Sequence, residues 1–272
     1  MANSDGRFAW YELLTTDFQS AKVFYPQVID GDVLDTPAPG RQYALLTAGD
    51  VVVGGLMELT GDARQSDVGS GWIGYVEVGD VDTIAERVKR LGGAVHVPPT
   101  DVPGISRFCI FADPQGARLG MLKWSAPVHG QSAPSRRKDV AWPELLAVNW
   151  ERALDFYVKL FDWQKAETKA GGFGTYQTFS ASHQPIGGIR DLPPAVKAPF
   201  WLYYFRVGDL DAALGRLTAA GGQILDEPFQ LSGDNWTVPC ADPQGAIFAL
   251  EGKRQKKPIG YFKGSQGQRW SW

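Results

Sequence analysis

Two carboxylates stand two residues after a tryptophan at matching places in the chain: Glu12 follows Trp10, and Glu144 follows Trp142. Because alternate residues of a strand project to the same face, each pair would place an indole ring beside a carboxylate. Such a pair can stack a flat organic molecule and anchor a polar or cationic group on it. An unpaired carboxylate in apolar surroundings can also act as a general base. Glu12 and Glu144 are therefore the candidate catalytic residues.

These residues lie in two copies of one sequence. Trp10 and Trp142 are 132 residues apart, and Asp113 and Asp242 are 129 apart. A match in the same order with little drift indicates two copies of one folding unit. The matching segments are FAWYELLTTDFQSAKVFY and VAWPELLAVNWERALDFY, GWIGYVEVGDVD and FWLYYFRVGDLD, and FADPQGA and CADPQGA.

Each copy is expected to fold as a strand, a helix and two strands, and then to repeat that order. In the first copy a strand over 8–14 leads to a helix capped by Asp17, and strands follow over 43–48 and 51–59. The second half has a strand over 72–78, a helix capped by Asp80 and ended by Gly92, and a hairpin turning at Asp113–Gly116. Asn149 and Asp209 are the caps expected in the second copy. The polar segment 126–138 is the predicted linker.

Composition limits the class of protein. With 272 residues, 44% of them hydrophobic and 21% charged, the chain is typical of globular domains. No apolar run approaches the roughly 18 residues of a membrane helix, and the N-terminal residues show no leader pattern, so we expect a cytoplasmic protein without a membrane partner. The net charge is −3, but Gly252–Trp272 carries +6 without an acid, which leaves −9 on the body. An acidic body argues against nucleic acid as a partner.

Cysteines and histidines offer little chemistry. Cys109 and Cys240 are near repeat mates, and both are expected to be small buried hydrophobes. His96 lies in a strand-like segment, His129 in the linker and His183 at a hairpin tip. None of the three histidines has a partner at the spacing of metal ligands, so structural or surface roles are expected.

The ordered motifs resemble the vicinal oxygen chelate superfamily, which includes glyoxalases, bleomycin-resistance proteins and extradiol dioxygenases. The resemblance rests on the opening strand and D-helix-FY segment, the V-x-D-V-D helix start, the LGG helix end and the ADPQGA hairpin, each present twice. It implies an α+β fold of two tandem glyoxalase-like modules, each a pair of βαβββ units forming a curved, partly open barrel. The predicted domains are residues 1–125 and 139–252, followed by a basic aromatic extension over 253–272.

The resemblance also implies positions for metal ligands, and the residues found there cannot bind a divalent ion. One position remains on the strand near residues 54–59, where Glu58 and its mate Asp191 are weak candidates, and Glu251 is a third. A single carboxylate holds a divalent metal poorly against water, so no metal and no other cofactor is expected. The six positions are Trp10, Ile73 and Gly120 in the first copy and Trp142, Leu202 and Ala249 in the second.

If the first tryptophan of each copy faces inward, strand alternation predicts an aromatic wall in each cavity. The predicted ligand-binding residues are Trp10, Glu12, Tyr43, Ile73, Tyr75 and Glu77, with Trp142, Glu144, Tyr176, Leu202, Tyr204 and Arg206 as their counterparts.

Three functions remain open. The favoured one is a metal-independent protein that binds a small, flat organic molecule, as bleomycin-resistance proteins do. The second is an enzyme of the lyase, isomerase or dioxygenase type, either metal-free or with a rearranged site. The third is an interaction protein whose barrels are filled and whose glutamates bond to backbone or to Arg107. Two modules in one chain suit either a monomer with internal pairing or a homodimer.

Overall fold

The computed structural model describes residues 6–36, 40–59, 69–126, 140–171, 174–194, 196–232 and 234–254. Most of the predicted linker, His129 and nearly all of the basic aromatic extension lie outside these ranges. Among the described residues, no helix has the length and apolar character needed to span a membrane.

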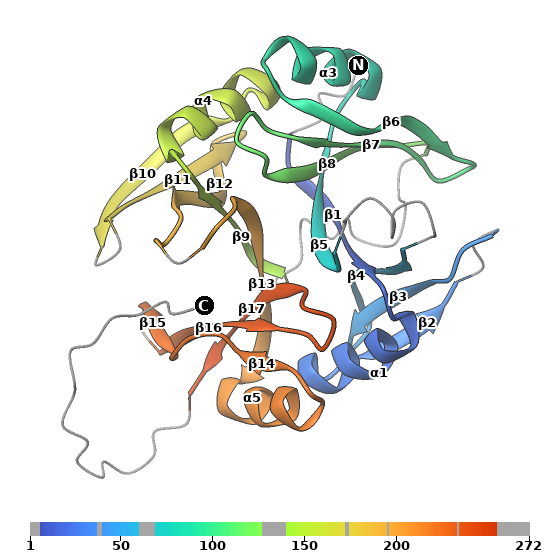
Figure 1. Ribbon diagram of the computed structural model, residues 1–272, viewed down its shortest axis with the longest axis vertical. Helices are drawn as coiled ribbons and strands as arrows, with labels where there is room; N and C mark the ends of the chain where they lie inside the picture. Colours follow the sequence, from blue (N-terminus) through green and yellow to red (C-terminus); the bar gives the residue numbers. More distant parts are fainter. Residues whose placement is uncertain are drawn as a thin grey trace. The chain divides into compact units, whose positions relative to one another are not determined.

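Both copies contain the βαβββ order that the family resemblance implies (Figure 1). The first copy comprises β1 (Phe8–Thr15), α1 (Phe18–Ile29), β2 (Asp32–Asp35), β3 (Tyr43–Ala48), β4 (Val51–Glu58), β5 (Gly71–Glu77), α3 (Val81–Arg90), β6 (Ala94–Val102), β7 (Ser106–Ala112) and β8 (Arg118–Trp124). The short strand β2 was absent from the sequence-based order because its residues are mostly exposed and show no alternation of apolar side chains.

The second copy repeats this order with one additional short strand near its end. It comprises β9 (Val140–Ala147), α4 (Trp150–Phe161), β10 (Gln164–Gly171), β11 (Gly174–Ala181), β12 (Gln184–Asp191), β13 (Phe200–Asp209), α5 (Leu210–Ala219), β14 (Gln223–Ile224), β15 (Phe229–Ser232), β16 (Asn235–Ala241) and β17 (Ile247–Lys253).

Each copy forms one open sheet. The eight-stranded sheet runs β2-β3-β4-β1-β5-β8-β7-β6, and the nine-stranded sheet runs β10-β11-β12-β9-β13-β17-β16-β14, with β15 paired to β16. The end strands of each sheet differ, so neither sheet is a closed barrel. Parallel pairing sets Tyr75 beside Gly120 in the first sheet and Tyr204 beside Ala249 in the second. Positions that match in sequence therefore match in register.

The helix caps and hairpin turns form as the sequence predicts. The side chains of Asp17, Asp80, Asn149 and Asp209 each accept a hydrogen bond from a backbone N–H in the first turn of the helix that follows. Asp113 Oδ1 accepts from the backbone N–H groups of Gln115 and Ala117 at 2.8 and 3.0 Å, which fixes the turn between β7 and β8. Local sequence thus places the ends of the strands that carry the candidate site.

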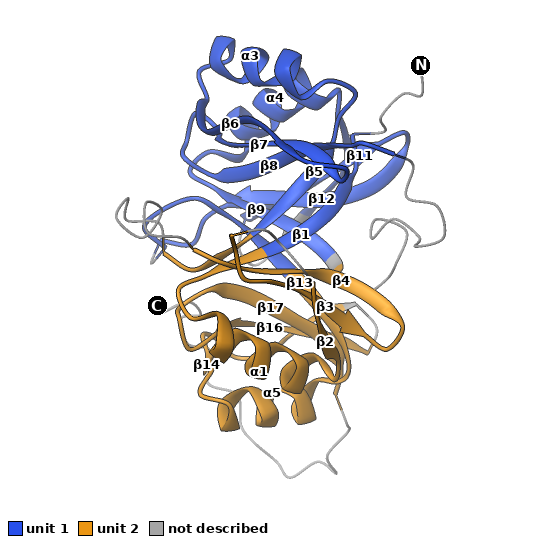
Figure 2. Cartoon of the chain, turned by 90° about the vertical axis from the view of Figure 1, so that its right-hand side faces the viewer, with its two compact units in different colours: residues 1–12, 73–137, 142–203 blue, residues 13–72, 138–141, 204–272 orange. Residues whose placement is uncertain are grey.

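The chain divides into two compact units, and each unit takes part of both sequence copies (Figure 2). Unit 1 comprises residues 1–12, 73–137 and 142–203, and unit 2 comprises residues 13–72, 138–141 and 204–272. The predicted domain boundaries, at the limits of the copies, therefore differ from the limits of the compact units.

A buried chain of polar groups holds the two copies together inside each unit. In unit 1, Trp201 Nε1 donates to Tyr157 Oη at 3.2 Å, and Tyr157 donates to Asp113 Oδ2 at 3.2 Å. In unit 2 the matching residues Trp72, Tyr25 and Asp242 make the same two bonds, at 3.0 and 2.9 Å. The aspartate of one copy thus binds the tyrosine on a helix of the other copy, and that tyrosine accepts from a tryptophan on a strand of the same copy. Because these groups are buried, each satisfied hydrogen bond avoids a desolvation cost.

Both cysteines are buried in the sheets, as the sequence predicts. Burial raises the pKa of the Cys109 thiol to about 12 and raises the pKa of Cys240 as well, so both thiols are protonated and unreactive near neutral pH.

Candidate functional site

In the first copy, the structure brings Glu12 and Tyr75 together on one face of the sheet within unit 1. Tyr75 Oη donates to Glu12 Oε2 at 3.0 Å, and the two residues are 3% and 8% exposed. The ring of Phe108, from β7, meets the ring of Tyr75 edge to face, with centroids 6.2 Å apart. A nearly buried carboxylate is therefore held by an uncharged hydroxyl and bordered by aromatic rings.

The Tyr75 ring lies directly over Gly120, one of the positions implied for a metal ligand. A Cβ added at Gly120 would stand 2.2 Å from the Cδ1 atom of Tyr75. Glycine is required there because any side chain would overlap the ring. The space that a ligating side chain would need is thus filled by an aromatic residue.

Two tryptophans border the same face. Trp10 on β1 and Trp124 at the end of β8 are both half-buried, and their rings meet edge to face with centroids 6.3 Å apart. Trp124 was absent from the predicted site. Its signal was available in the alternation of β8, because Trp124 is four residues after Gly120 and so shares its face.

In the second copy the matching carboxylate, Glu144, is paired with an arginine. Arg190 Nε donates to Glu144, and the two residues are 5% and 3% exposed, so the ion pair is almost fully removed from solvent. Nearby, Trp142 Nε1 donates to Tyr176 Oη at 2.7 Å. The pKa of Tyr176 is raised, first by burial and then by the negative charge of Glu144. The predicted residues Trp142, Glu144 and Tyr176 are thus gathered in unit 1.

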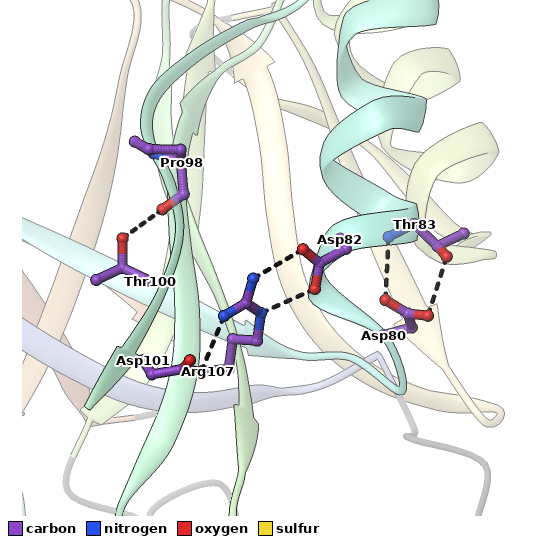
Figure 3. Close-up of polar contacts among 7 residues, drawn as sticks. All are labelled: Asp80, Asp82, Thr83, Pro98, Thr100, Asp101 and Arg107. Carbon is purple, nitrogen blue, oxygen red and sulfur yellow. Dashed lines mark hydrogen bonds and ion pairs between the residues drawn. The ribbon is translucent and has the colours of Figure 1, made fainter. Parts of the chain in front are cut away.

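The sequence did not identify Arg190 as the residue that neutralises Glu144. The available signal was the arginine within the apolar strand segment GGIRDL. Arg190 is two residues after Gly188 and so shares its face, and the Tyr176 hydroxyl lies over Gly188. The expected alternative partner, Arg107, is engaged elsewhere. It pairs with Asp82 on α3 and Asp101 on β6 (Figure 3).

The remaining predicted residues of unit 1 are Ile73, Glu77 and Leu202. Ile73 and Leu202 are buried, while Glu77 is half-buried. Neither Ile73 nor Leu202 offers a polar group, and both belong to the buried apolar interior.

Unit 2 contains the predicted residues Tyr43, Tyr204 and Arg206. The Tyr43 hydroxyl lies over Gly55, as Tyr176 lies over Gly188. Tyr204 is buried, and Arg206 is exposed with its Nη2 atom 3.4 Å from Glu251 Oε1. Tyr43 also lines a shallow depression of about 420 Å³ between α1 and the β2–β3 segment, together with Phe18, Lys22 and Arg41.

The weak metal-ligand candidates have other partners. Glu58 Oε2 accepts from Gln42 Nε2 at 2.8 Å. Asp191 is exposed, and its Oδ1 accepts from the backbone N–H of Trp150 at the start of α4, at 2.9 Å. Within the ranges that the structure describes, no group of three or more His, Cys, Asp or Glu side chains is arranged to hold a metal.

The two described histidines have unremarkable surroundings. His183 occupies the turn between β11 and β12 with φ of 63°, as expected of a hairpin tip. His96 lies in β6, and its pKa is lowered, first by burial and then by the charge of Arg118.

Comparison with known proteins defines the class. The model of the glyoxalase/bleomycin resistance protein/dioxygenase superfamily matches residues 7–121 and again residues 140–250. The chain therefore belongs to this superfamily.

Among individual relatives, the putative glyoxylase CFP32 of Mycobacterium tuberculosis is 30% identical over 244 residues, covering 89% of this chain and 92% of that protein. The anthracycline biosynthesis protein DnrV of Streptomyces peucetius is 27% identical over 266 residues, covering 93% and 95%. Both similarities extend over both copies, so the tandem arrangement is shared.

Solved structures share the fold at lower identity. The Mn(II)-bound glyoxalase from Novosphingobium aromaticivorans matches with a TM-score of 0.59 and 16% identity, covering 91% of this chain and 82% of that one. The 2,3-dioxygenase LapB from Pseudomonas sp. KL28 matches with a TM-score of 0.59 and 12% identity, covering 94% and 95%.

The metal that such a fold implies does not fit the residues of this chain. Indole rings occupy two of the six implied ligand positions, and aliphatic side chains or no side chain occupy the other four. None of these groups supplies an oxygen, imidazole nitrogen or thiolate donor.

Proposed function

We propose that this protein binds a small, planar aromatic molecule at the first-copy face, without a resident metal. This aromatic face is defined by Trp10, Glu12, Tyr75, Phe108 and Trp124. The observation that carries the proposal is the gathering of aromatic rings on the face of the sheet that carries a nearly buried carboxylate, where metal ligands are implied. Rings of this kind stack flat ligands, and the carboxylate attracts a donor or cationic group.

The names of relatives support a ligand of this shape. DnrV and a second relative of 26% identity, DauV, are named for anthracycline biosynthesis, and anthracyclines are polycyclic aromatic compounds. A polycycle offers the broad apolar surface that half-buried tryptophans can cover.

The ion pair of Glu144 in the second copy supports a single ligand site, located in the first copy. Glu144 is neutralised by Arg190, so it offers no net charge to a ligand, and the ring contacts between Trp10 and Trp124 and between Tyr75 and Phe108 lie in the first copy. We assign the ligand to the first copy for this reason.

Titration of the metal-free protein with planar aromatic amines, followed by calorimetry, tests the proposal. Trp10→Leu is expected to weaken binding by about tenfold, because a stacking contact contributes roughly 0.5–1.5 kcal/mol beyond area burial. Trp142→Leu, the same change at the equivalent position of the second copy, is the matched control and should leave the affinity unchanged. Equal losses in the two variants, or no binding by the unaltered protein, would refute the assignment.

Elemental analysis tests the absence of a resident metal. Protein purified without chelator is expected to contain far less than one equivalent of Mn, Fe, Ni or Zn. A stoichiometric metal would contradict the chemistry of the six implied ligand positions.

A second candidate function is a metal-free lyase or isomerase in which Glu12 acts as general base. The favouring observation is that Glu12 is nearly buried and accepts a hydrogen bond from the uncharged Tyr75 hydroxyl. Glu12→Gln would then abolish product formation while binding of the aromatic molecule persists. Loss of binding without any detectable reaction in the unaltered protein would leave only the binding function.

A further inference from the structure

One polar atom of the aromatic face has no hydrogen-bond partner among the described residues. The indole Nε1 of Trp124 is buried and makes no hydrogen bond within the part of the chain that the structure describes. A buried N–H without an acceptor costs free energy, because the group has lost its hydrogen bonds to water.

Four other indoles of the described chain satisfy this requirement. Three of them donate to tyrosine hydroxyls and one donates to a backbone carbonyl. The pairs are Trp72 with Tyr25, Trp142 with Tyr176, Trp201 with Tyr157, and Trp163 with the carbonyl of Gly6.

The position of Trp124 connects this donor to the aromatic face. Its ring contacts Trp10 edge to face, and in the β7–β8 register it lies opposite Ser106, which is buried. Leu122 and Gly120 precede it at alternate positions of β8, so all three residues share the face that carries Tyr75. Trp124 therefore lies on the face of the sheet that carries Tyr75, the partner of Glu12.

We propose that the ligand places a carbonyl or quinone oxygen against Trp124 Nε1, so that the bound molecule is an aromatic ketone or quinone. This inference rests on the proposed function and narrows its ligand class. Stacking on the tryptophans alone would accept any flat hydrocarbon, whereas an unsatisfied donor favours a ligand with an acceptor at its edge. Glu12 selects for a donor or cationic substituent on the same molecule.

Two matched probes separate the acceptor from the ring system: 2-(aminomethyl)anthraquinone and 2-(aminomethyl)anthracene. They share the amine and the tricyclic outline and differ by two carbonyl groups. The unaltered protein is expected to bind the quinone roughly two- to tenfold more tightly than the hydrocarbon, the range for one neutral hydrogen bond.

Replacement of Trp124 by 3-benzothienylalanine removes the N–H and keeps the shape of the ring. This variant is expected to lose the preference for the quinone and to keep its affinity for the hydrocarbon. Trp124→Phe should also lose the preference, with an added loss of affinity for both probes. The same replacement at Trp142, whose N–H already has an acceptor, is the control that should keep the preference.

A quinone preference that survives removal of the Trp124 N–H would overturn the inference while leaving the binding function intact. So would an unaltered protein that binds both probes equally well. Failure of both probes to bind would remove the proposed function and this inference together.

Discussion

At the scale of single residues, the two copies stabilise one carboxylate position in different ways. Glu12 accepts from the Tyr75 hydroxyl, whereas Glu144 pairs with Arg190 in a site almost closed to solvent. Removing one member of a buried ion pair leaves an uncompensated charge, while removing both members together is often neutral. The second-copy pair is therefore best explained as a structural element, and its energetics can be measured directly.

Arg190→Met is expected to lower the free energy of unfolding by about 3–5 kcal/mol, because Glu144 would stay buried without its partner. Adding Glu144→Leu to this variant should restore most of the loss. Urea denaturation monitored by tryptophan fluorescence measures both changes. Arg206→Met serves as control, since the Arg206 side chain is 40% exposed and its removal should cost less than about 1 kcal/mol. A double variant as unstable as the single one would contradict a pairing role.

At the scale of elements, a close approach between β5 and β8 defines the shape of the aromatic face. The register places Tyr75 beside Gly120, and the ring occupies the volume next to the glycine Cα. In the second copy the corresponding pair is Tyr204 and Ala249, which shows that the equivalent place in the other sheet admits a methyl group. The two sheets therefore differ in local packing although their strand order corresponds.

Gly120→Ala is expected to destabilise the protein by about 1–3 kcal/mol, the usual effect of adding a methylene to a filled core. The displaced Tyr75 ring should also weaken its hydrogen bond to Glu12. Thermal unfolding provides the measurement. Gly215→Ala is the matched control: a Cβ at this position of α5 meets open space, so the change should stabilise the helix by up to about 1 kcal/mol. A tolerated Gly120→Ala would show that the ring has room to move.

At the scale of the whole molecule, each compact unit is built from parts of both sequence copies. The Trp–Tyr–Asp chains in unit 1 and unit 2 each join an aspartate of one copy to a helix and a strand of the other. Each copy on its own would lack these partners and would expose the aromatic side chains that they cover. Because both copies belong to one chain, each copy is always present with the copy that it packs against.

Cleavage at a protease site inserted in the linker, between residues 126 and 139, is expected to leave the two fragments associated. Each unit buries tyrosine, tryptophan and phenylalanine side chains from both copies, and such contacts resemble those of a domain core. Native mass spectrometry of the cut protein should therefore show one species with the mass of the uncut protein plus one water. Fragments that separate at micromolar concentration would contradict interdependent folding.

A pH dependence of stability follows from the buried aspartates of the two Trp–Tyr–Asp hydrogen-bond chains. Burial raises the pKa of Asp113 and of Asp242 above the ordinary value of about 4. The folded protein then binds the carboxyl protons of Asp113 and Asp242 more tightly than the unfolded chain does. The contribution of these two protonated groups to stability is complete below about pH 4 and is lost as pH rises through the folded pKa. The stability of the unaltered protein, relative to the Asp113→Asn/Asp242→Asn variant, should therefore fall as pH rises above about 4. Chemical denaturation across this range measures the difference, and an opposite slope would mean that hydrogen bonding to the carboxylates outweighs burial.

Local pattern in the sequence determined a large part of this structure. The repeated segments, the caps at Asp17, Asp80, Asn149 and Asp209, and the two hairpin turns depend on residues close together in the chain, so spacing alone predicted them. Strand alternation also placed Glu12 and Tyr75 on one face. The unsuitability of the implied metal positions could be seen without coordinates, because it concerns which residue types are present.

Tertiary structure decided which side chains meet. The pairing of Arg190 with Glu144 and the Tyr75 ring over Gly120 depend on the register and packing of strands that are distant in sequence. So does the Trp124 N–H, which has no acceptor among the residues that the structure describes. A shift of one residue in register would exchange the two faces of a strand, and nothing in local periodicity fixes that choice. The exchange of parts between the copies was hidden for the same reason, since a repeat in sequence reveals equal folding units and leaves open which halves pack together.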